Sequence, residues 1–198
     1  MKEFYGENDG LLVILHGGAG PQDPTGKGVQ EAEASLLRIG KQVSARLREG
    51  MPLLEAVTFC LQKLELDPQF NAGIGSALQS DGLARLSASL MEGRSQRFSG
   101  VISVPYLSHP SRLAQALQKR KARVLTQPGA ELLARELGLP LHSNSTENRS
   151  QRWLAHLNAS GYNIENVDTV GCVIRSKDGK VAAGGSTGGR GFEFPGRV

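Results

Sequence analysis

The sequence predicts a mixed α/β fold in which helices pack on a sheet, and three observations support this prediction. A continuous apolar run at 11–15 passes into a glycine turn at 16–20, which is typical of a buried strand. Two segments with apolar residues at helical spacing follow that turn. Further along, Asp178-Gly179 separates two apolar runs, which is a strong hairpin signal. Strands and helices do not alternate regularly, so we expect a layered sandwich rather than a doubly wound sheet.

Two long helices are expected at 28–48 and 53–64. The first carries apolar side chains three and four residues apart. The second has Pro52 in its first turn, where a backbone N–H would have no partner in any case. Asp67-Pro68 closes the second helix, and the glycine-rich segment 70–76 is expected to be a loop.

The middle of the chain is expected to hold two strands and two further helices. Residues 83–90 lie between two glycine turns, which favours a strand, and 98–104 is expected to be another. Helices are expected at 111–123 and 129–137, with Gly138 as the C-terminal stop of the second.

Polar residues dominate 142–168, which we interpret as a linker that contains a helical patch around Trp153. Beyond this linker, 169–174 and 180–183 are expected to be the two strands of the hairpin. The second strand then leads into a glycine cluster at 184–191, which is typical of a turn whose backbone approaches a ligand.

The composition is that of a globular protein. The chain has 198 residues, a formal net charge of +4, 39 % apolar residues and 21 % charged residues, which argues against disorder. No apolar run approaches the roughly 20 residues of a membrane span, and the N-terminus lacks the apolar core of a secretory signal. We therefore expect a cytoplasmic protein without a membrane partner, in which Cys60 and Cys172 are buried free thiols. The basic residues of 112–123 lack interleaved aromatic side chains, so we expect no nucleic-acid partner.

Two short motifs point to enzyme classes that the rest of the sequence does not support. Residues 184–188 match the G-x-S-x-G nucleophile elbow of α/β-hydrolases. All four histidines precede Ser186, however, and neither His nor Asp follows it, which is contrary to the chain order of that fold. The strand that runs into His-Gly-Gly also occurs in amino-acid kinases, but no glycine-rich phosphate loop with its lysine is present.

A third pattern combines two threonines and an arginine. Thr169 starts one expected hairpin strand, and Thr187 follows eighteen residues later, so the hairpin can return Thr187 beside Thr169. Arg197 lies ten residues further on and offers a planar fork for a substrate carboxylate. Taken alone, Thr169 is better interpreted as a solvated β-branched residue at the start of a strand, and it is the combination with Thr187 and Arg197 that points to a site.

Six segments, spread in one order over nearly the whole chain, resemble the plant-type L-asparaginase and isoaspartyl peptidase family of N-terminal-nucleophile (Ntn) hydrolases. The segments are Val-Ile-Leu-His-Gly-Gly-Ala-Gly at 13–20, Phe-Asn-Ala-Gly-Ile-Gly-Ser at 70–76, Leu-Ser-Ala-Ser-Leu-Met-Glu-Gly at 86–93, Asp-Thr-Val-Gly at 168–171 with Val-Ala-Ala at 181–183, Ser-Thr-Gly-Gly at 186–189 and Pro-Gly-Arg-Val at 195–198.

The resemblance implies an Ntn-hydrolase αββα sandwich. In that arrangement, residues 1–141 correspond to the α-subunit and 142–168 to the linker before an autocleavage site. Residues 169–198 correspond to the start of the β-subunit, of which this chain supplies the first hairpin. The resemblance also implies a dimer of processed protomers.

The mechanism that the resemblance implies begins with cleavage between Asp168 and Thr169. The hydroxyl of Thr169 attacks the Asp168 carbonyl, and the released α-amine of Thr169, with a normal pKa near 8, then serves as general base. Thr169 becomes the nucleophile in hydrolysis of L-asparagine or β-aspartyl (isoaspartyl) dipeptides. Thr187 orients this nucleophile, Arg197 binds the substrate α-carboxylate, and Asn71 lies near the scissile bond.

No cofactor is expected for catalysis, but the resemblance implies a structural sodium ion held by backbone carbonyls. Carbonyl oxygens are suitable ligands for such a hard cation. A plain turn is an equally good interpretation of the same segment. The expected ligands are Leu64, Glu65, Asp67, Phe70, Ala72 and Ile74.

Three departures from the family pattern matter for function. Asp168 stands where asparaginase-type members usually have glycine, and an Asp-Thr junction is typical of glycosylasparaginases and threonine aspartases, so these activities are alternatives. Ser87 replaces an aspartate and Glu92 replaces another. The family pattern also continues past Val198 into a Gly-Asp pair for the substrate amine and a Thr-Gly segment for the oxyanion hole. We therefore interpret this sequence as truncated at its C-terminus, and a catalytically inactive remnant is the alternative of another class.

Overall fold

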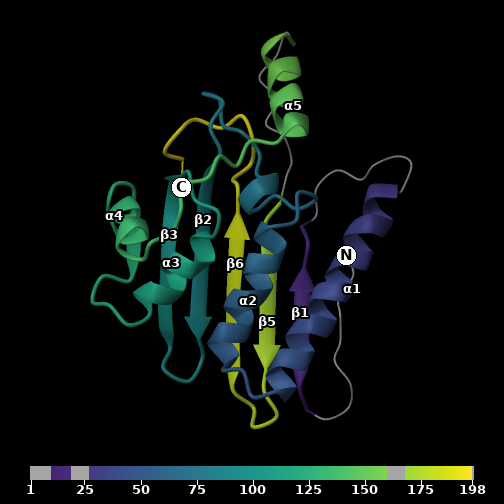
Figure 1. Cartoon of the computed structure of the whole chain (residues 1–198), viewed down its shortest axis with the longest axis vertical. Coiled ribbons are helices and arrows are strands. Elements are labelled where there is room, and N and C mark those ends of the chain that lie inside the picture. The colour runs from purple at the N-terminus through teal and green to yellow at the C-terminus, as the bar shows by residue number, and fades with distance from the viewer. Residues whose placement is uncertain (1–9, 19–26, 160–167, 198) are drawn as a thin grey trace.

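A six-stranded sheet forms the centre of the protein in the computed structural model, which describes residues 10–18, 27–159 and 168–197 (Figure 1). The strands are ordered β1-β5-β6-β2-β3-β4, and each neighbouring pair is antiparallel except β3 and β4, which are parallel. The C-terminal hairpin therefore lies between two strands from the first half of the chain. The strands are β1 (Leu12–His16), β2 (Arg85–Glu92), β3 (Arg97–Pro105), β4 (Val124–Thr126), β5 (Val170–Arg175) and β6 (Val181–Thr187).

The helices α1, α2 and α3 cover one face of this sheet, with α2 over its centre and α1 over the β1 side (Figure 1). Helix α5 lies instead beyond one end of the strands. The helical elements are α1 (Lys27–Arg48), α2 (Leu53–Glu65), the short 3₁₀ helix η1 (Gly73–Gly75), α3 (Pro110–Leu117), α4 (Gly129–Glu136) and α5 (Glu147–Leu157).

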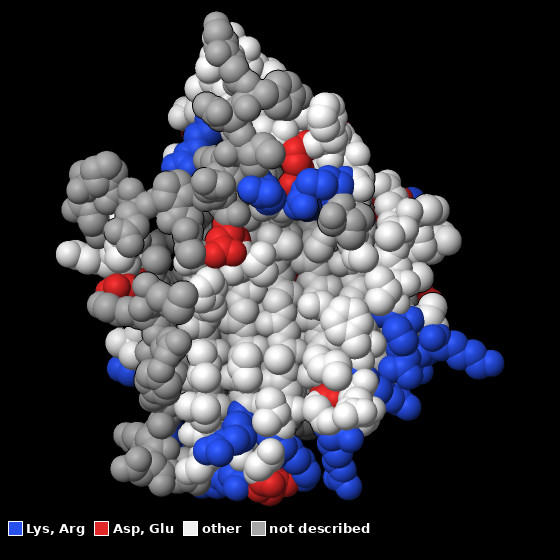
Figure 2. Space-filling model, turned by 180° about the vertical axis from the view of Figure 1, so that it is seen from behind, with Lys and Arg blue, Asp and Glu red and all other residues white. Residues whose placement is uncertain are grey.

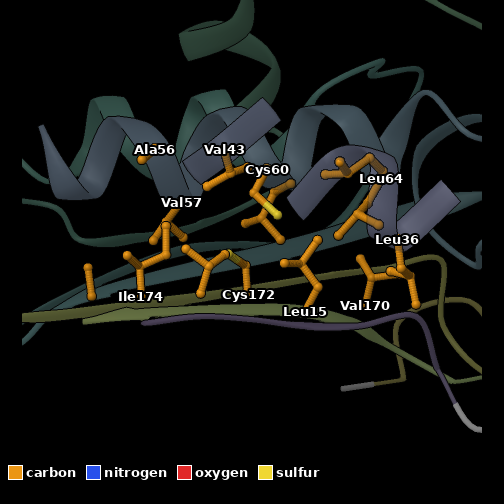
Figure 3. Close-up of a cluster of buried hydrophobic side chains, with 14 of the residues drawn as sticks. Leu15, Leu36, Val43, Ala56, Val57, Cys60, Leu64, Val170, Cys172 and Ile174 are labelled. Atoms are coloured by element: carbon orange, nitrogen blue, oxygen red, sulfur yellow. The ribbon is translucent and has the colours of Figure 1, made fainter. Parts of the chain in front are cut away.

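The main core lies between α1, α2 and the sheet. Helix α2 begins after Pro52, and its apolar side chains recur at helical spacing, so one face of the helix is fully buried. Figure 3 shows these side chains pointing onto the side chains of β1 and β5 from above, with Cys60 of α2 close to Cys172 of β5. Both cysteines are free and buried. A second, smaller core joins α3 and α4 to β2 and β3.

The structure confirms the mixed α/β content that the sequence predicts. The expected helices at 28–48, 53–64 and 129–137 appear as α1, α2 and α4, each within one residue of its expected bounds. The hairpin is confirmed as well, because the Gly179 N–H donates to the Ser176 carbonyl at 2.9 Å and Gly179 has a φ of +81°. Gly138, with a φ of +65°, ends α4 as expected.

The helix predicted at 111–123 was wrong in length, and strand β4 was not predicted. Helix α3 ends at Leu117, because apolar residues stop there and a basic run follows. The buried side chain of Gln118 then ties the chain to the sheet, since its Nε2 donates to the Leu90 and Arg97 carbonyls at 3.3 and 3.1 Å. Further along, Val124–Thr126 pair with β3 as the short parallel strand β4.

The sequence range 142–168, interpreted above as a linker, contains the ordered helix α5. Its helical patch around Trp153 is thereby confirmed. Thr146 caps the N-terminus of this helix, where its Oγ1 accepts a hydrogen bond from the Arg149 N–H at 3.3 Å. Residues 160–167 lie outside the described residues.

The other face of the sheet is open in the part of the chain that the structure describes. Because side chains alternate along a strand, every second residue of β2, β3, β5 and β6 points to this face. It bears small and apolar side chains, including Val173 at 40 % and Phe98 at 48 % exposure. Figure 2 shows a broad uncharged area there, with Lys and Arg gathered mainly around its edge.

Among the described residues, no helix has the length and apolar character that crossing a membrane requires.

Burial raises the pKa of the Cys60 thiol well above its usual value, and the hydrogen bond with Cys172 acts in the same direction. Because alkylation requires the thiolate, we expect native Cys60 to resist iodoacetamide at mildly alkaline pH. Mass spectrometry should show label at this position only after unfolding in concentrated guanidinium chloride. Rapid labelling of Cys60 in the native protein would contradict the buried core described here.

Candidate active site

The start of β5 and the end of β6 meet at one end of the sheet, because these two strands are antiparallel neighbours (Figure 1). Val170 lies opposite Ser186, so Thr169 and Thr187 are next in register. Val170 and Ser186 are buried on the helix side, which places both threonine side chains on the open face. Both line one cavity of about 180 Å³ there. The expectation that the hairpin returns Thr187 beside Thr169 is confirmed.

Asn71 binds the peptide bond that precedes Thr169. Its Nδ2 donates to the Asp168 carbonyl at 3.0 Å and to the Gly189 carbonyl at 2.6 Å. Its Oδ1 accepts the Ala77 N–H at 2.9 Å, and the residue is only 6 % exposed. The side chain therefore joins three separate segments, and one of its N–H groups points at the carbonyl where charge develops if Thr169 attacks.

The glycine turn after β1 lies against the same bond. The Gly18 N–H donates to Nδ1 of His16 at 3.1 Å, and that nitrogen lies 3.2 Å from the Thr169 carbonyl oxygen. Gly18 has a φ of +102°, and a Cβ added to it would lie 3.3 Å from the Asp168 Cβ. Only glycine gives the turn both this backbone conformation and this close approach. The sequence analysis included the turn in its motifs but did not identify His16 as a site residue.

Thr187 is held in place from both sides of the strand. Its Oγ1 accepts the Gly189 N–H at 3.1 Å, which fixes the turn that follows β6. On the helix side, the hydroxyl of the preceding Ser186 donates to Oε1 of Glu65 at 2.8 Å. Gly188 packs so closely that a Cβ there would lie 2.3 Å from the Cβ of Ser76.

Glu65 is a fully buried carboxylate with four hydrogen-bond donors. Oε1 accepts from the Ser111 N–H and the Ser186 hydroxyl, and Oε2 accepts from the Ser111 hydroxyl at 2.8 Å and lies 3.1 Å from Nδ1 of His109. These contacts join the end of α2 to the start of α3 and to β6. From the sequence, Glu65 was expected to contribute only its backbone carbonyl. Its place four residues after Leu61 on the buried face of α2 was the signal that its side chain also has a function.

Arg197 lies beside Thr187 and is oriented by a second buried carboxylate. Its Nε donates to Oε2 of Glu193 at 2.7 Å, and the Glu193 side chain is only 3 % exposed. Neither terminal nitrogen of the Arg197 guanidinium has a hydrogen-bond partner among the described residues, so both are available to a ligand. Arg197 and Glu193 line a cavity of about 240 Å³ together with Thr187. The sequence analysis missed Glu193, although its opposite charge four residues before Arg197 could have indicated it.

A chain of alternating charges extends along the wall of this cavity. Nε2 of Gln79 donates to Glu193 at 3.3 Å, and its Oε1 accepts from Nη1 of Arg85 at 2.6 Å. Arg85 is also bidentate to Asp81, at 3.0 and 2.8 Å. The hydrogen bond from Arg85 lowers the pKa of the Asp81 carboxyl below its usual value. Oγ of Ser87 accepts the Ser103 N–H at 3.0 Å.

The loop expected to hold sodium is wound so tightly that only glycine fits at two positions. Gly73 has a φ of +53°, and a Cβ there would lie 2.0 Å from the Glu65 carbonyl oxygen. A Cβ on Gly75 would lie 2.2 Å from the Phe70 oxygen and 2.7 Å from that of Pro68. Carbonyl oxygens thus crowd the inside of the loop, and these donors suit a hard cation. No cluster of His, Cys, Asp and Glu side chains among the described residues could hold a metal ion.

Comparison with known proteins points in one direction. The model of a protein family described as "Asparaginase" matches residues 9–198. A protein of Synechocystis sp. named isoaspartyl peptidase/L-asparaginase is 43 % identical over 199 residues, which cover 94 % of this chain and 60 % of that protein. A protein of Nostoc sp. with the same name is 41 % identical and is covered over 63 % of its length.

More distant relatives carry similar names. A plant-type L-asparaginase of Pyrobaculum calidifontis is 33 % identical, over 94 % of this chain and 65 % of its own length. An isoaspartyl peptidase of Salmonella typhimurium is 33 % identical with the same two coverages. The chain thus spans about three fifths of the length of the curated relatives that it matches.

Replacement of Glu65 by Gln keeps the shape of the side chain but removes its charge and one acceptor. The four donors around it cannot all be satisfied then, so we expect a loss of about 1–3 kcal/mol in the free energy of unfolding. Urea denaturation followed by circular dichroism measures this loss. Glu49→Gln is the matched control, because Glu49 is exposed and its ion pair with Arg46 contributes little. Equal effects of the two substitutions would contradict the role given to Glu65.

Proposed function

This chain belongs to the asparaginase family, and from that premise we propose that it cleaves itself before Thr169 and then hydrolyses L-asparagine or β-aspartyl dipeptides. The names of its relatives support the substrate class. The single observation that carries the proposal is the hydrogen bond from Asn71 Nδ2 to the carbonyl of Asp168, at the bond that precedes a hydroxyl residue.

In the first step, Oγ1 of Thr169 attacks the carbonyl carbon of Asp168. Asn71 donates to the oxygen that becomes negatively charged, as an oxyanion hole does. The C–N bond breaks, the nitrogen of Thr169 takes up the proton that the hydroxyl loses, and an ester joins the two residues. Water then hydrolyses this ester, which leaves a carboxylate on Asp168 and a free amine and hydroxyl on Thr169.

In the second step, the new amine of Thr169 acts as general base toward its own hydroxyl, since an α-amine has a normal pKa near 8. The hydroxyl attacks the side-chain carbonyl of the aspartyl group, and ammonia or an amino acid leaves. Water hydrolyses the acyl-enzyme and releases aspartate. The side chain of Thr187 is on the same face and in the same cavity, where it can orient the nucleophile.

Substrate binding is assigned to Arg197. Glu193 occupies its Nε, so the two terminal nitrogens are directed to a substrate α-carboxylate in the cavity beside Thr187. A glycosylasparaginase-like or threonine-aspartase-like substrate is the second candidate. This second candidate is favoured by the junction itself, where an aspartate stands in place of the glycine usual in asparaginase-type members. Oδ1 of this Asp168 accepts the Thr169 N–H at 2.6 Å.

The same proposal extends to the surroundings of the site. The uncharged open face of the sheet (Figure 2) packs against a second sheet, which gives the αββα sandwich. The carbonyls of the loop around Gly73 and Gly75 hold a structural sodium ion that stiffens the segment after Asn71. The processed protomers associate as dimers in the cytoplasm.

Self-cleavage is tested by intact-mass spectrometry of the full chain during incubation. We expect two fragments that meet at the bond between Asp168 and Thr169, and none from Thr169→Ala, which lacks the nucleophile. Asn71→Ala removes the oxyanion donor and should slow cleavage about 100- to 1,000-fold. Thr126→Ala, at an exposed threonine of the edge strand β4 that lines neither cavity, should cleave at the normal rate. An uncut wild-type chain, or equal cleavage of all variants, would contradict the proposal.

Substrate recognition is tested on the cleaved protein with asparagine, a β-aspartyl dipeptide and glycosylated asparagine. Arg197→Leu should raise KM about 10- to 100-fold through loss of a charge-assisted carboxylate contact, with a smaller effect on kcat. Preference for glycosylated asparagine would establish the second candidate instead. An unchanged KM in the Arg197 variant would show that another group binds the carboxylate.

A further inference from the structure

Two loops that carry proposed site residues lie side by side at the end of the sheet. We call them the loop pair: the first loop is 71–80, with Asn71, and the second is 188–197, with Arg197. The Gly188 N–H donates to the Asn71 carbonyl at 3.0 Å, the Phe192 N–H to the Leu78 carbonyl at 2.8 Å, and the Ser80 N–H to the Glu193 carbonyl at 3.0 Å. These three backbone hydrogen bonds tie the two loops to each other along their length.

Helix α5 lies against this loop pair with one face. Nε of Arg149 donates to the Gly75 carbonyl at 2.8 Å, and Nε1 of Trp153 donates to the Gln79 carbonyl at 3.0 Å. One turn later, the ring of His156 stacks on the ring of Phe192, with centroids 3.6 Å apart and planes at 18°. Residues at i, i+4 and i+7 share one side of a helix, so the three contacts form a single row. Figure 1 shows α5 standing beyond the ends of β5 and β6.

Specific contacts, rather than burial of apolar surface, hold α5 in this place. Leu154 and Leu157 are 52 % and 55 % exposed, so its leucines do not provide the attachment. Arg149 is buried. Trp153 packs so closely on Gly82 that a Cβ added to Gly82 would lie 3.1 Å from the indole ring. Two backbone carbonyls of the first loop accept hydrogen bonds from α5 side chains. Loss of either donor would leave the carbonyl unpaired and destabilise the loop.

We propose that α5 is a clamp that positions both site loops, with Arg149 and Trp153 acting on Asn71 through the first loop and His156 acting on Arg197 through the second. The roles of Asn71 and Arg197 in this inference rest on the proposed function. His156 precedes the bond between Asp168 and Thr169, and Phe192 follows it, so the clamp spans the proposed cut. Helix α5 therefore remains part of the site in the cleaved protein and contacts both fragments, which the sheet already holds together.

The order of the loops depends on contacts of this kind. The Ala77 N–H donates to Oδ1 of Asn71 and so orients the amide whose Nδ2 donates to the Asp168 carbonyl. Ala77 lies between Gly75 and Gln79, the two residues whose carbonyls α5 binds. Loops with few apolar contacts open locally at low free energy, unless tertiary contacts hold them. Loss of the α5 contacts should raise local opening of the loop pair and leave the strands unaffected.

Hydrogen exchange of the full chain, followed residue by residue, tests the clamp without any need for catalysis. Trp153→Ala should speed exchange of the Ala77 amide about tenfold, since a buried hydrogen bond and its packing are lost. His156→Ala should speed exchange of the Phe192 amide more than that of Ala77. Trp153→Phe, which keeps the ring but not the N–H, is the second variant if the alanine variant does not fold. Leu154→Ala, on an exposed side of the same helix, should change neither amide.

The outcomes separate the clamp from its alternatives. Equal exchange of Ala77 and Phe192 in the wild type and the Trp153 and His156 variants would overturn the inference. So would a uniform increase over the loops and strands, because it would indicate a merely structural role of α5. Trp153 is the only tryptophan of the sequence, so a red shift of its emission in His156→Ala supports the clamp, and unchanged emission opposes it. If the wild type does not cut itself while the exchange pattern holds, the proposed function fails and the clamp stands.

Discussion

The side-chain amide of Asn71 joins the segments on which the rest of the site depends. One nitrogen binds the carbonyl before Thr169 and the carbonyl of Gly189, and the oxygen binds the amide of Ala77. Every polar atom of the side chain therefore has a partner inside a nearly buried environment, where an unpaired group would be costly. Loss of this one amide would separate the Asp168–Thr169 peptide bond, the turn after Thr187 and the loop that follows α2.

The sheet determines which groups can reach that bond. In the antiparallel hairpin, the first residue of one strand and the last of the other lie at the same end, and alternation directs Thr169 and Thr187 to one face. The opposite face of the same strand presents Ser186 to the buried carboxylate of Glu65. A strand held from both sides in this way cannot slip by one residue without exchanging its two faces.

Charge is distributed over the site as paired groups. Glu193 neutralises one edge of the Arg197 guanidinium and leaves the other for an anion. The side chain of Gln79 then links Glu193 to Arg85 by hydrogen bonds, and Arg85 in turn binds Asp81. A guanidinium that is held by a buried carboxylate loses little freedom when it binds a substrate, which favours affinity. Helix α5 then lies across both loops that carry these groups.

The sequence by itself determined the periodic elements and the motifs, because apolar spacing, an Asp-Gly turn and short segments such as 70–76 and 186–189 are local properties. It therefore predicted α1, α2, the hairpin and the candidate residues Asn71, Thr169, Thr187 and Arg197. Only the tertiary structure decided that Glu65, Glu193, His16 and α5 support these residues. It also tied the chain to the sheet directly after Leu117 through the side chain of Gln118, and it paired Val124–Thr126 with β3. The physical reason is distance along the chain: Trp153 meets the Gln79 carbonyl across 74 residues, Glu65 meets Ser186 across 121, and His16 meets Thr169 across 153. No local pattern encodes which distant partner an indole, a carboxylate or an imidazole will find, and Glu193 is the exception because Arg197 lies only four residues further on.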